Sequence, residues 1–86
     1  MKTVLKVFVA EDCAGCAEAR AIAGRIQKEY PTLAVEVVEL ADSGAALPEG
    51  VFATPTYMLN NRVVSLGNPK PDEIARWVSK ATSRLA

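Results

Sequence analysis

Two cysteines, Cys13 and Cys16, are the residues of this 86-residue chain whose type and spacing could do chemistry. Residues three apart on a helix project from the same face, which brings two thiols near disulfide-bonding distance. The free N–H groups and the dipole at a helix N-terminus stabilise a thiolate, the nucleophilic form of cysteine. If a helix starts here, Cys13 at its tip is the exposed attacking thiol, and Cys16, one turn further, resolves the mixed disulfide.

The residues around the pair act on it in different ways. Ala14 and Gly15 are small and leave room for the backbone of a partner to approach. Glu11 and Asp12 precede the pair, and negative charge nearby disfavours a thiolate. The helix end therefore favours a lowered thiol pKa, and the two carboxylates oppose that shift.

Two other interpretations of the pair stay open. Two cysteines at a helix start could be passive core residues. A closed zinc site needs four ligands, and the chain has two Cys and no His, so one chain alone does not supply such a site. A dimer that pools four cysteines could hold a metal or an iron–sulfur cluster. For a monomer we expect no metal and no cofactor.

The composition predicts one small globular domain over residues 1–86. Half of the residues are apolar (50%) and 23% are charged, as in ordinary soluble domains. Ten basic and ten acidic residues cancel, so no basic stripe follows a phosphate backbone and nucleic acid is not expected as a partner. No apolar run approaches the roughly 20 residues that span a bilayer, so no membrane partner is expected either. We expect a monomer.

The N-terminal residues do not resemble an export signal. Lys6 interrupts the apolar stretch, acidic residues follow it, and it has no small-residue cleavage site. Without such a signal the expected location is the reducing cytoplasm. A lone cysteine pair there is more often catalytic or metal-binding than structural.

Apolar periodicity predicts the elements that position the pair. Residues 3–10 form an almost continuous apolar run, typical of a strand buried on both faces. From 13 to 30 the apolar residues recur at helical spacing, and Pro31 ends the pattern. Residues 33–40 predict a second strand, with acidic residues that mark a sheet edge.

The second half of the chain predicts a hairpin and a final helix. Residues 41–53 have no clean period and predict a loop with room for one helical turn. Two short apolar runs, 56–59 and 62–66, flank an Asn-Asn pair at 60–61, and Asn tolerates the positive φ of a tight hairpin turn. A helix over about 71–85 starts on a proline and carries an apolar stripe.

The predicted order is β-α-β-β-β-α, an α/β fold. A right-handed crossover pairs the first two strands in parallel, and the hairpin adds antiparallel strands. The result is a four-stranded mixed sheet covered by two main helices. The cysteine pair lies where the first strand ends and the first helix begins.

Three features together resemble the thioredoxin superfamily over nearly the whole chain. Residues 7–16, VFVAEDCAGC, resemble the family's strand leading into its Cys-x-x-Cys motif. Residues 50–57, GVFATPTY, resemble the loop that carries its cis-proline. The hairpin, Gly67 and the terminal helix follow in the family's order, without the additional N-terminal strand and helix of full thioredoxins, a shortening similar to glutaredoxin. A Cys-x-x-Cys with a downstream Thr-Pro-Thr is much more specific than either motif alone.

The resemblance implies roles for residues outside the pair. Pro55 would be cis and would face the cysteines, and the backbone of Thr54 would pair with the extended backbone of a substrate by strand addition. Ala14, Gly15 and Gly67 would complete that docking surface. By itself, this Thr-Pro-Thr would be an ordinary turn before a strand.

The sequence departs from the family at several positions. Asp12 stands where the family has a Trp, and Val7 stands where thioredoxins carry a buried acid for the resolving cysteine's proton. Glu39 on the second strand is a remote substitute for that acid. The segment 66–69 replaces the Gly-Gly-acid segment of glutaredoxins, which leaves little support for a glutathione site.

The resemblance implies a thiol–disulfide oxidoreductase that reduces protein disulfides. A reductase or a low-molecular-weight thiol would then recycle the pair. The replaced Trp and acid leave a second hypothesis open, a non-catalytic redox-sensing or binding module of the same fold.

Overall fold

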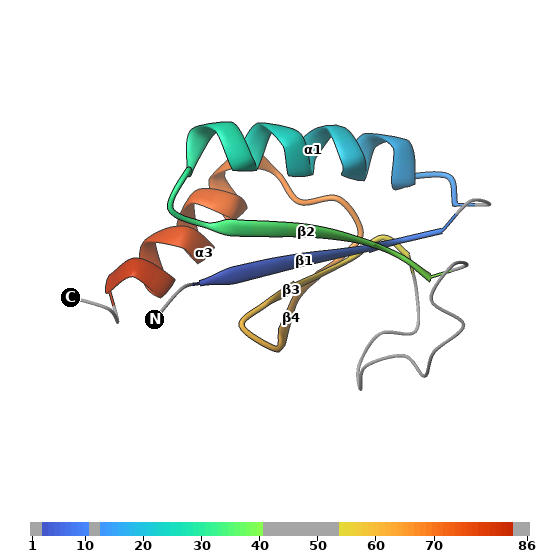
Figure 1. The fold of residues 1–86 in the computed structure, drawn as a ribbon. Coiled ribbons are helices and arrows are strands. Elements are labelled where there is room, and N and C mark those ends of the chain that lie inside the picture. Colours follow the sequence, from blue (N-terminus) through green and yellow to red (C-terminus); the bar gives the residue numbers. More distant parts are fainter. Residues whose placement is uncertain (1–2, 11–12, 41–53, 84–86) are drawn as a thin grey trace.

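The elements of the chain follow the predicted order. The structure, a computed structural model, describes residues 3–10, 13–40 and 54–83. In these ranges the chain forms β1 (Val4–Val9), α1 (Cys16–Glu29), β2 (Ala34–Glu39), β3 (Thr56–Leu59), β4 (Arg62–Leu66) and α3 (Pro71–Ser83) (Figure 1). The predicted loop at 41–53, the acidic residues Glu11 and Asp12, and the last residues of the predicted final helix lie outside the described residues.

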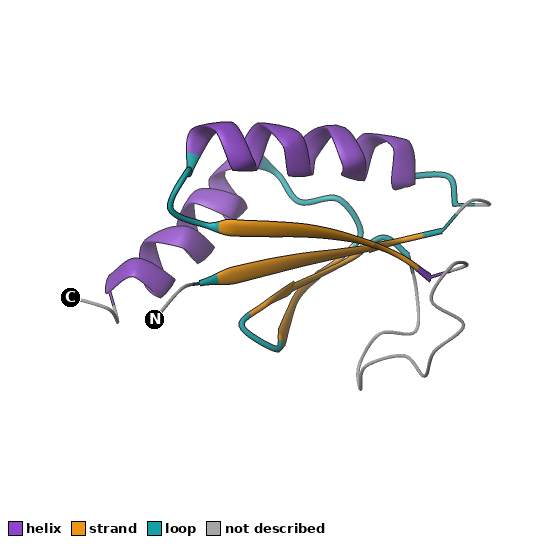
Figure 2. Cartoon of the chain, in the orientation of Figure 1, coloured by secondary structure: helices purple, strands orange, loops and turns teal. Residues whose placement is uncertain are grey.

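The strands form one mixed sheet in the order β2-β1-β3-β4 (Figure 2). β1 and β2 run parallel, with Val7 opposite Val37. β3 is antiparallel to both β1 and β4. The predicted α/β fold, a four-stranded sheet with one parallel pair and an antiparallel hairpin, is confirmed.

Both helices pack on one face of the sheet. Side chains alternate between the faces of a strand, and Leu5, Val7 and Val9 of β1 share one core with the buried residues of α1 and α3. Phe8 of β1 and Met58 of β3 form a second buried cluster on the other face. The C-terminal half of β1 is therefore buried on both sides, as its nearly unbroken apolar run predicted.

The first helix begins at Cys16 rather than at residue 13. Before it, the chain forms a turn in which the Cys16 N–H donates to the Cys13 carbonyl (3.2 Å). Gly15 is the N-cap residue, and its carbonyl accepts the first helical hydrogen bond, from the Ala19 N–H (3.0 Å). At the other end α1 stops before Pro31, as predicted.

The β3–β4 hairpin turns at Asn60 and Asn61, which have positive φ values of 49° and 69°. Asn is among the few residues that tolerate this conformation, and the predicted tight turn is confirmed. Asn60 also ties the hairpin to the start of β1. It donates its N–H to the Val4 carbonyl and accepts from the Val4 N–H at Oδ1, both at 3.0 Å.

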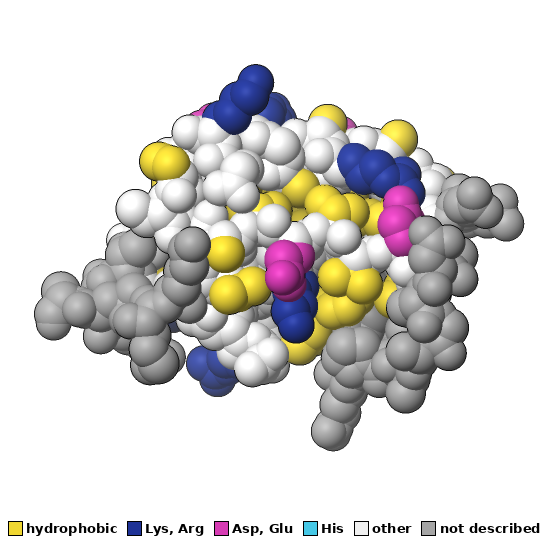
Figure 3. All heavy atoms as spheres, in the orientation of Figure 1, with side chains coloured by type: hydrophobic (Ala, Val, Ile, Leu, Met, Phe, Trp, Pro, Cys, Tyr) yellow, Lys and Arg dark blue, Asp and Glu magenta, His cyan; other side chains and the backbone are white. Residues whose placement is uncertain are grey.

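The described surface carries both signs of charge. In the view of Figure 3 the Lys and Arg side chains lie apart from one another rather than in one patch. Neither described helix is long and apolar enough to span a bilayer. The expectations about nucleic-acid and membrane partners stay predictions.

Candidate redox site

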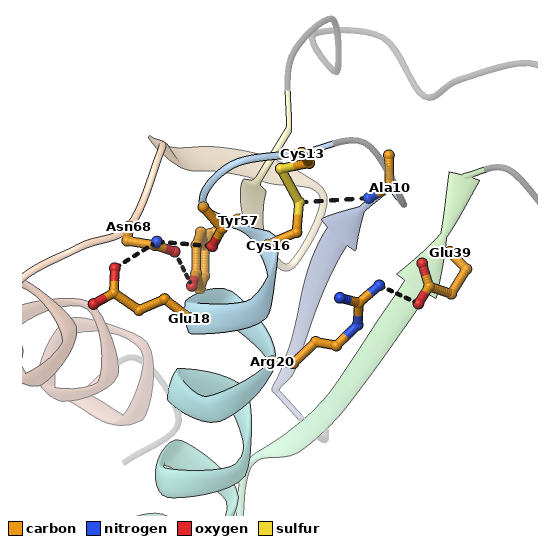
Figure 4. The surroundings of a disulfide bond; sticks show 9 residues. Ala10, Cys13, Cys16, Glu18, Arg20, Glu39, Tyr57 and Asn68 are labelled. Carbon is orange, nitrogen blue, oxygen red and sulfur yellow. Dashed lines mark hydrogen bonds and ion pairs between the residues drawn. A yellow bond between two sulfur atoms is a disulfide. The ribbon is translucent and has the colours of Figure 1, made fainter.

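Cys13 and Cys16 are joined by a disulfide at the start of α1 (Figure 4), with an S–S distance of 2.10 Å and Cα atoms 5.4 Å apart. Cys16 is only 1% exposed, whereas Cys13 is half-buried. The Ala10 N–H, just beyond β1, donates to Cys16 Sγ (3.4 Å). The pair thus has the difference in exposure that an attacking thiol and a resolving thiol require.

The local sequence explains why one sulfur is buried and the other is not. Cys16 begins the buried face of α1, which continues at Ala19 one turn later. It belongs to the same core as Val9, the last residue of β1. Because that core holds Cys16 in place, the turn before the helix keeps Cys13 nearer the surface.

Pro55 lies against the turn between the cysteines. A Cβ atom at Gly15 would be 3.5 Å from Pro55 Cδ, so the bare Gly15 backbone lies close to the proline ring. The Thr54–Pro55 peptide bond is cis, Pro55 is buried and Thr54 is half-buried. Gly67, with φ of +110°, donates its N–H to the Pro55 carbonyl (2.8 Å). Gly15, Pro55 and Gly67, far apart in the sequence, are therefore neighbours here, and Ala14 is exposed between the cysteines.

The position of the family's buried acid holds an apolar side chain. Val7 on β1 is fully buried in the core. Glu39, the remote substitute, forms an ion pair with Arg20 of α1 instead, on the other side of the helix from Asn68 (Figure 4). In the part of the chain that the structure describes, no three His, Cys, Asp or Glu side chains cluster to hold a metal. The metal-bridged dimer stays a prediction.

Asn68 is a neighbour of the cysteine turn that the sequence reasoning missed. Its Nδ2 donates to the Gly15 carbonyl (3.0 Å) and to Glu18 Oε2 (2.8 Å), and its Oδ1 accepts from the Tyr57 hydroxyl (2.9 Å). The sequence showed only a turn around this residue. No local pattern could identify the contacts, because Gly15 and Glu18 precede Asn68 by 53 and 50 residues.

Tyr57 supports this arrangement from the core. Its ring is fully buried on β3 and lies 6.1 Å from that of Trp77 on α3, centre to centre. Burial raises the pKa of Tyr57 to about 12, the negative charge of Glu18 adds to the rise, and Arg25 opposes it. The hydroxyl therefore stays protonated at neutral pH and donates to Asn68.

A family model described as a thioredoxin domain matches residues 3–79. The chain belongs to the thioredoxin domain family. A probable thioredoxin from Archaeoglobus fulgidus is 27% identical over 79 residues, which cover 90% of this chain and 87% of that protein. Membership of the family confirms the resemblance that the two motifs indicated.

Two solved structures share the fold. The oxidised thioredoxin from Plasmodium falciparum matches with a TM-score of 0.68 at 20% identity, covering 93% of this chain and 81% of that chain. The reduced glutaredoxin from Escherichia coli matches with a TM-score of 0.59 at 16% identity, covering 93% and 98%. These identities carry the fold alone. Together with the Cys13–Cys16 disulfide, the family supports a thiol–disulfide redox function.

Proposed function

We propose that this protein is an enzyme that reduces disulfide bonds of other proteins through Cys13 and Cys16. The observation that carries the proposal is the disulfide-bonded pair at the N-terminus of α1, with Cys13 half-buried and Cys16 buried. Free N–H groups and the dipole at this helix end stabilise a thiolate on Cys13, the less buried of the two cysteines. That thiolate is the nucleophile of thiol–disulfide exchange.

The reaction consists of two exchanges. The Cys13 thiolate attacks one sulfur of the substrate disulfide, whose S–S bond breaks, and the other substrate sulfur leaves as a thiolate. Cys16 then loses its proton and attacks Cys13 Sγ, which closes the Cys13–Cys16 disulfide and releases the second substrate thiolate. The substrate gains two electrons and the cysteine pair loses two.

The proton of Cys16 needs an acceptor, and Val7 offers none. The departing substrate thiolate or water accepts it in this proposal. The Ala10 N–H, 3.4 Å from Cys16 Sγ, stabilises the resulting thiolate by hydrogen bonding.

Substrate docking is proposed to involve Thr54, Pro55, Ala14, Gly15 and Gly67. The Thr54 backbone would take up the substrate as an added extended strand, which gives affinity with little demand on sequence. The close approach of Pro55 to Gly15, and the hydrogen bond from Gly67 to the Pro55 carbonyl, support a common surface. The small residues of this surface, Ala14, Gly15 and Gly67, leave its backbone open to a partner.

The oxidised pair must be reduced after each turnover. A reductase or a low-molecular-weight thiol would supply the two electrons. We further propose that the protein works in the cytoplasm as a single-domain monomer, since a reducing compartment keeps such a pair ready to attack.

The test is reduction of insulin disulfides with dithiothreitol as the electron donor. Wild-type protein is expected to accelerate the reaction, and Cys13→Ser is expected to return it to the uncatalysed rate. Equal urea midpoints of the reduced wild type and the variant would show that the fold is intact. A catalysed rate that survives Cys13→Ser would reject the assignment to this pair.

The buried Val7 favours a second candidate, a redox-sensing or binding module without catalysis. An attacking thiol in such a module needs no activation. Alkylation by iodoacetamide as a function of pH separates the two candidates. A Cys13 pKa at the ordinary value of a free thiol supports the sensor, and a lowered one supports the enzyme.

A further inference from the structure

We propose that Asn68 is a positioning residue of the redox site: by holding the Gly15 carbonyl it fixes the turn that brings Cys13 and Cys16 together, and so favours their disulfide. The inference rests on the proposed function, because it concerns the same pair. It assigns Asn68 a role in the redox equilibrium of the cysteines rather than in contact with the substrate.

The amide of Asn68 has one orientation. Both of its N–H donors are used, one by the Gly15 carbonyl (3.0 Å) and one by Glu18 Oε2 (2.8 Å). Its oxygen faces the Tyr57 hydroxyl (2.9 Å), which can only donate to it while the phenol is protonated. Because Tyr57 is fully buried, its position is set by the core, and the amide is held from that side.

The amide also fits closely against the turn. A Cβ atom at Gly15 would lie only 3.1 Å from Asn68 Nδ2. The glycine therefore allows the amide to reach the backbone between the cysteines. Figure 4 shows Asn68 between Glu18 and Tyr57 at the N-terminal end of α1.

The Gly15 carbonyl is the point at which this contact reaches the cysteines. It accepts two hydrogen bonds, one from Asn68 and one from the Ala19 N–H (3.0 Å). Together they hold the peptide unit that connects Gly15 to Cys16. In the disulfide form the S–S bond restrains this turn together with the two hydrogen bonds. In the dithiol form the S–S bond is absent, and the hydrogen bonds alone restrain the turn.

Loss of Asn68 would therefore act more on the reduced form than on the oxidised form. A released turn gains backbone freedom only where no covalent bond already restrains it. The reduced pair gains more of this freedom, so the equilibrium moves toward the dithiol. A preorganised turn, by contrast, brings the two sulfurs together at lower entropic cost.

The experiment measures the equilibrium of the full chain with a glutathione buffer for the wild type, Asn68→Ala and Asn68→Asp. The constant for forming the disulfide is expected to fall by about threefold to tenfold in both variants, the equivalent of one hydrogen bond. Asn68→Asp keeps an acceptor for the Tyr57 hydroxyl but has no N–H for Gly15. It therefore removes the contacts of the amide nitrogen with Gly15 and Glu18 and keeps the contact with the core. It also adds a negative charge beside Glu18, which Asn68→Ala does not.

Gln27→Ala is the matched control. Gln27 is also an amide that ties α1 to a neighbouring segment, through the Leu33 carbonyl (3.0 Å) and the Val35 N–H (3.3 Å), at the far end of the helix. A contact that only stabilises the fold lowers the stability of the oxidised and reduced forms equally, and the redox constant then does not move. Gln27→Ala is expected to lower the urea midpoint of both forms and to change the constant by less than about twofold.

Three results would overturn the inference: both Asn68 variants with the wild-type constant, an equal shift in Gln27→Ala, or two Asn68 variants that fail to fold while Gln27→Ala folds. A wild-type pair that equilibrates with glutathione but does not accelerate insulin reduction would reject the proposed function and leave the inference intact. A wild-type pair that never oxidises would reject both.

Discussion

The two ends of α1 are held in different ways. At the C-terminal end, Gln27 bonds to the backbone of Leu33 and Val35, only six and eight residues further along the chain. At the N-terminal end, Gly15 provides no side-chain cap, and its carbonyl accepts a side-chain hydrogen bond from Asn68, 53 residues away, besides the helical one from the Ala19 N–H. The C-terminal end is therefore held by the segment that directly follows the helix, and the N-terminal end by a segment distant in the sequence.

Because of this difference, we expect the C-terminal end of α1 to affect the stability of the protein and the N-terminal end to affect the reactivity of the cysteines. The far end of α1 packs into the core through residues such as Ile26 and carries no reactive group. The near end carries the cysteines and is held by the side chain of Asn68. A substitution at the far end should therefore alter stability, and one at the near end should alter the redox chemistry.

The largest effect is expected from Cys16→Ser at the near end. Cys13 can still attack, but the mixed disulfide cannot be resolved, so turnover stops and the adduct accumulates. Mass spectrometry under non-reducing conditions, after incubation with a disulfide-containing peptide, should find one peptide per protein. Cys13→Ser is the matched control and should give no adduct. An adduct on Cys16 in that control would reverse the assigned roles.

Ile26→Ala at the far end should give the next largest effect, on stability alone. Ile26 is 2% exposed, and its truncation should lower the free energy of unfolding by about 2–5 kcal/mol. Urea denaturation of the oxidised and reduced forms measures this. The glutathione equilibrium of the folded protein should change by less than about twofold. A larger change would show that the two ends are coupled and would break the comparison.

Tyr57→Phe tests the support behind Asn68. The folded pKa of about 12 lies above the ordinary 10.0, so between these values the unfolded chain loses a proton that the folded protein keeps. Stability should fall as pH rises through this window, by up to about 1.4 kcal/mol per pH unit, and Tyr57→Phe should lack this component. Below pH 10 the contribution is complete, and the variant should be less stable by about 1 kcal/mol for the lost hydrogen bond.

The measurement is the difference in urea stability between wild type and Tyr57→Phe across that pH window. The difference removes the titration of every other group. If the stability difference stays constant as the pH rises, the fold does not keep the Tyr57 hydroxyl protonated. The Tyr57 hydroxyl is then not the fixed donor that orients the Asn68 amide.

Glu39→Gln should have the smallest effect. The Arg20 and Glu39 side chains are 40% and 36% exposed, and such ion pairs contribute less than about 1 kcal/mol. The insulin-reduction rate and the glutathione equilibrium should equal those of the wild type, since the pair does not touch the cysteine turn. A clear loss of rate would restore Glu39 as an acceptor for the Cys16 proton.

Much of the fold could be predicted because its signals are local. Pro31 ends the first helix, Pro71 starts the last one, and the Asn-Asn pair turns the hairpin, each through its own backbone preference. The start of α1 was predicted too early, at residue 13. Periodicity reports which side chains are buried, whereas the helix starts where the first hydrogen bond to the Gly15 carbonyl forms.

By itself, the sequence determined that this protein has one cysteine pair at a strand–helix junction, in a chain with the family's order of elements. Residue type and spacing over a few positions are enough for that, because strand and helix periods act over short stretches. Only the tertiary structure decided what touches the turn between the cysteines. The resemblance to the family placed Pro55 there, but Asn68 reaches Gly15 because the sheet and both helices pack around one core, and such packing has no signature in any short stretch of sequence.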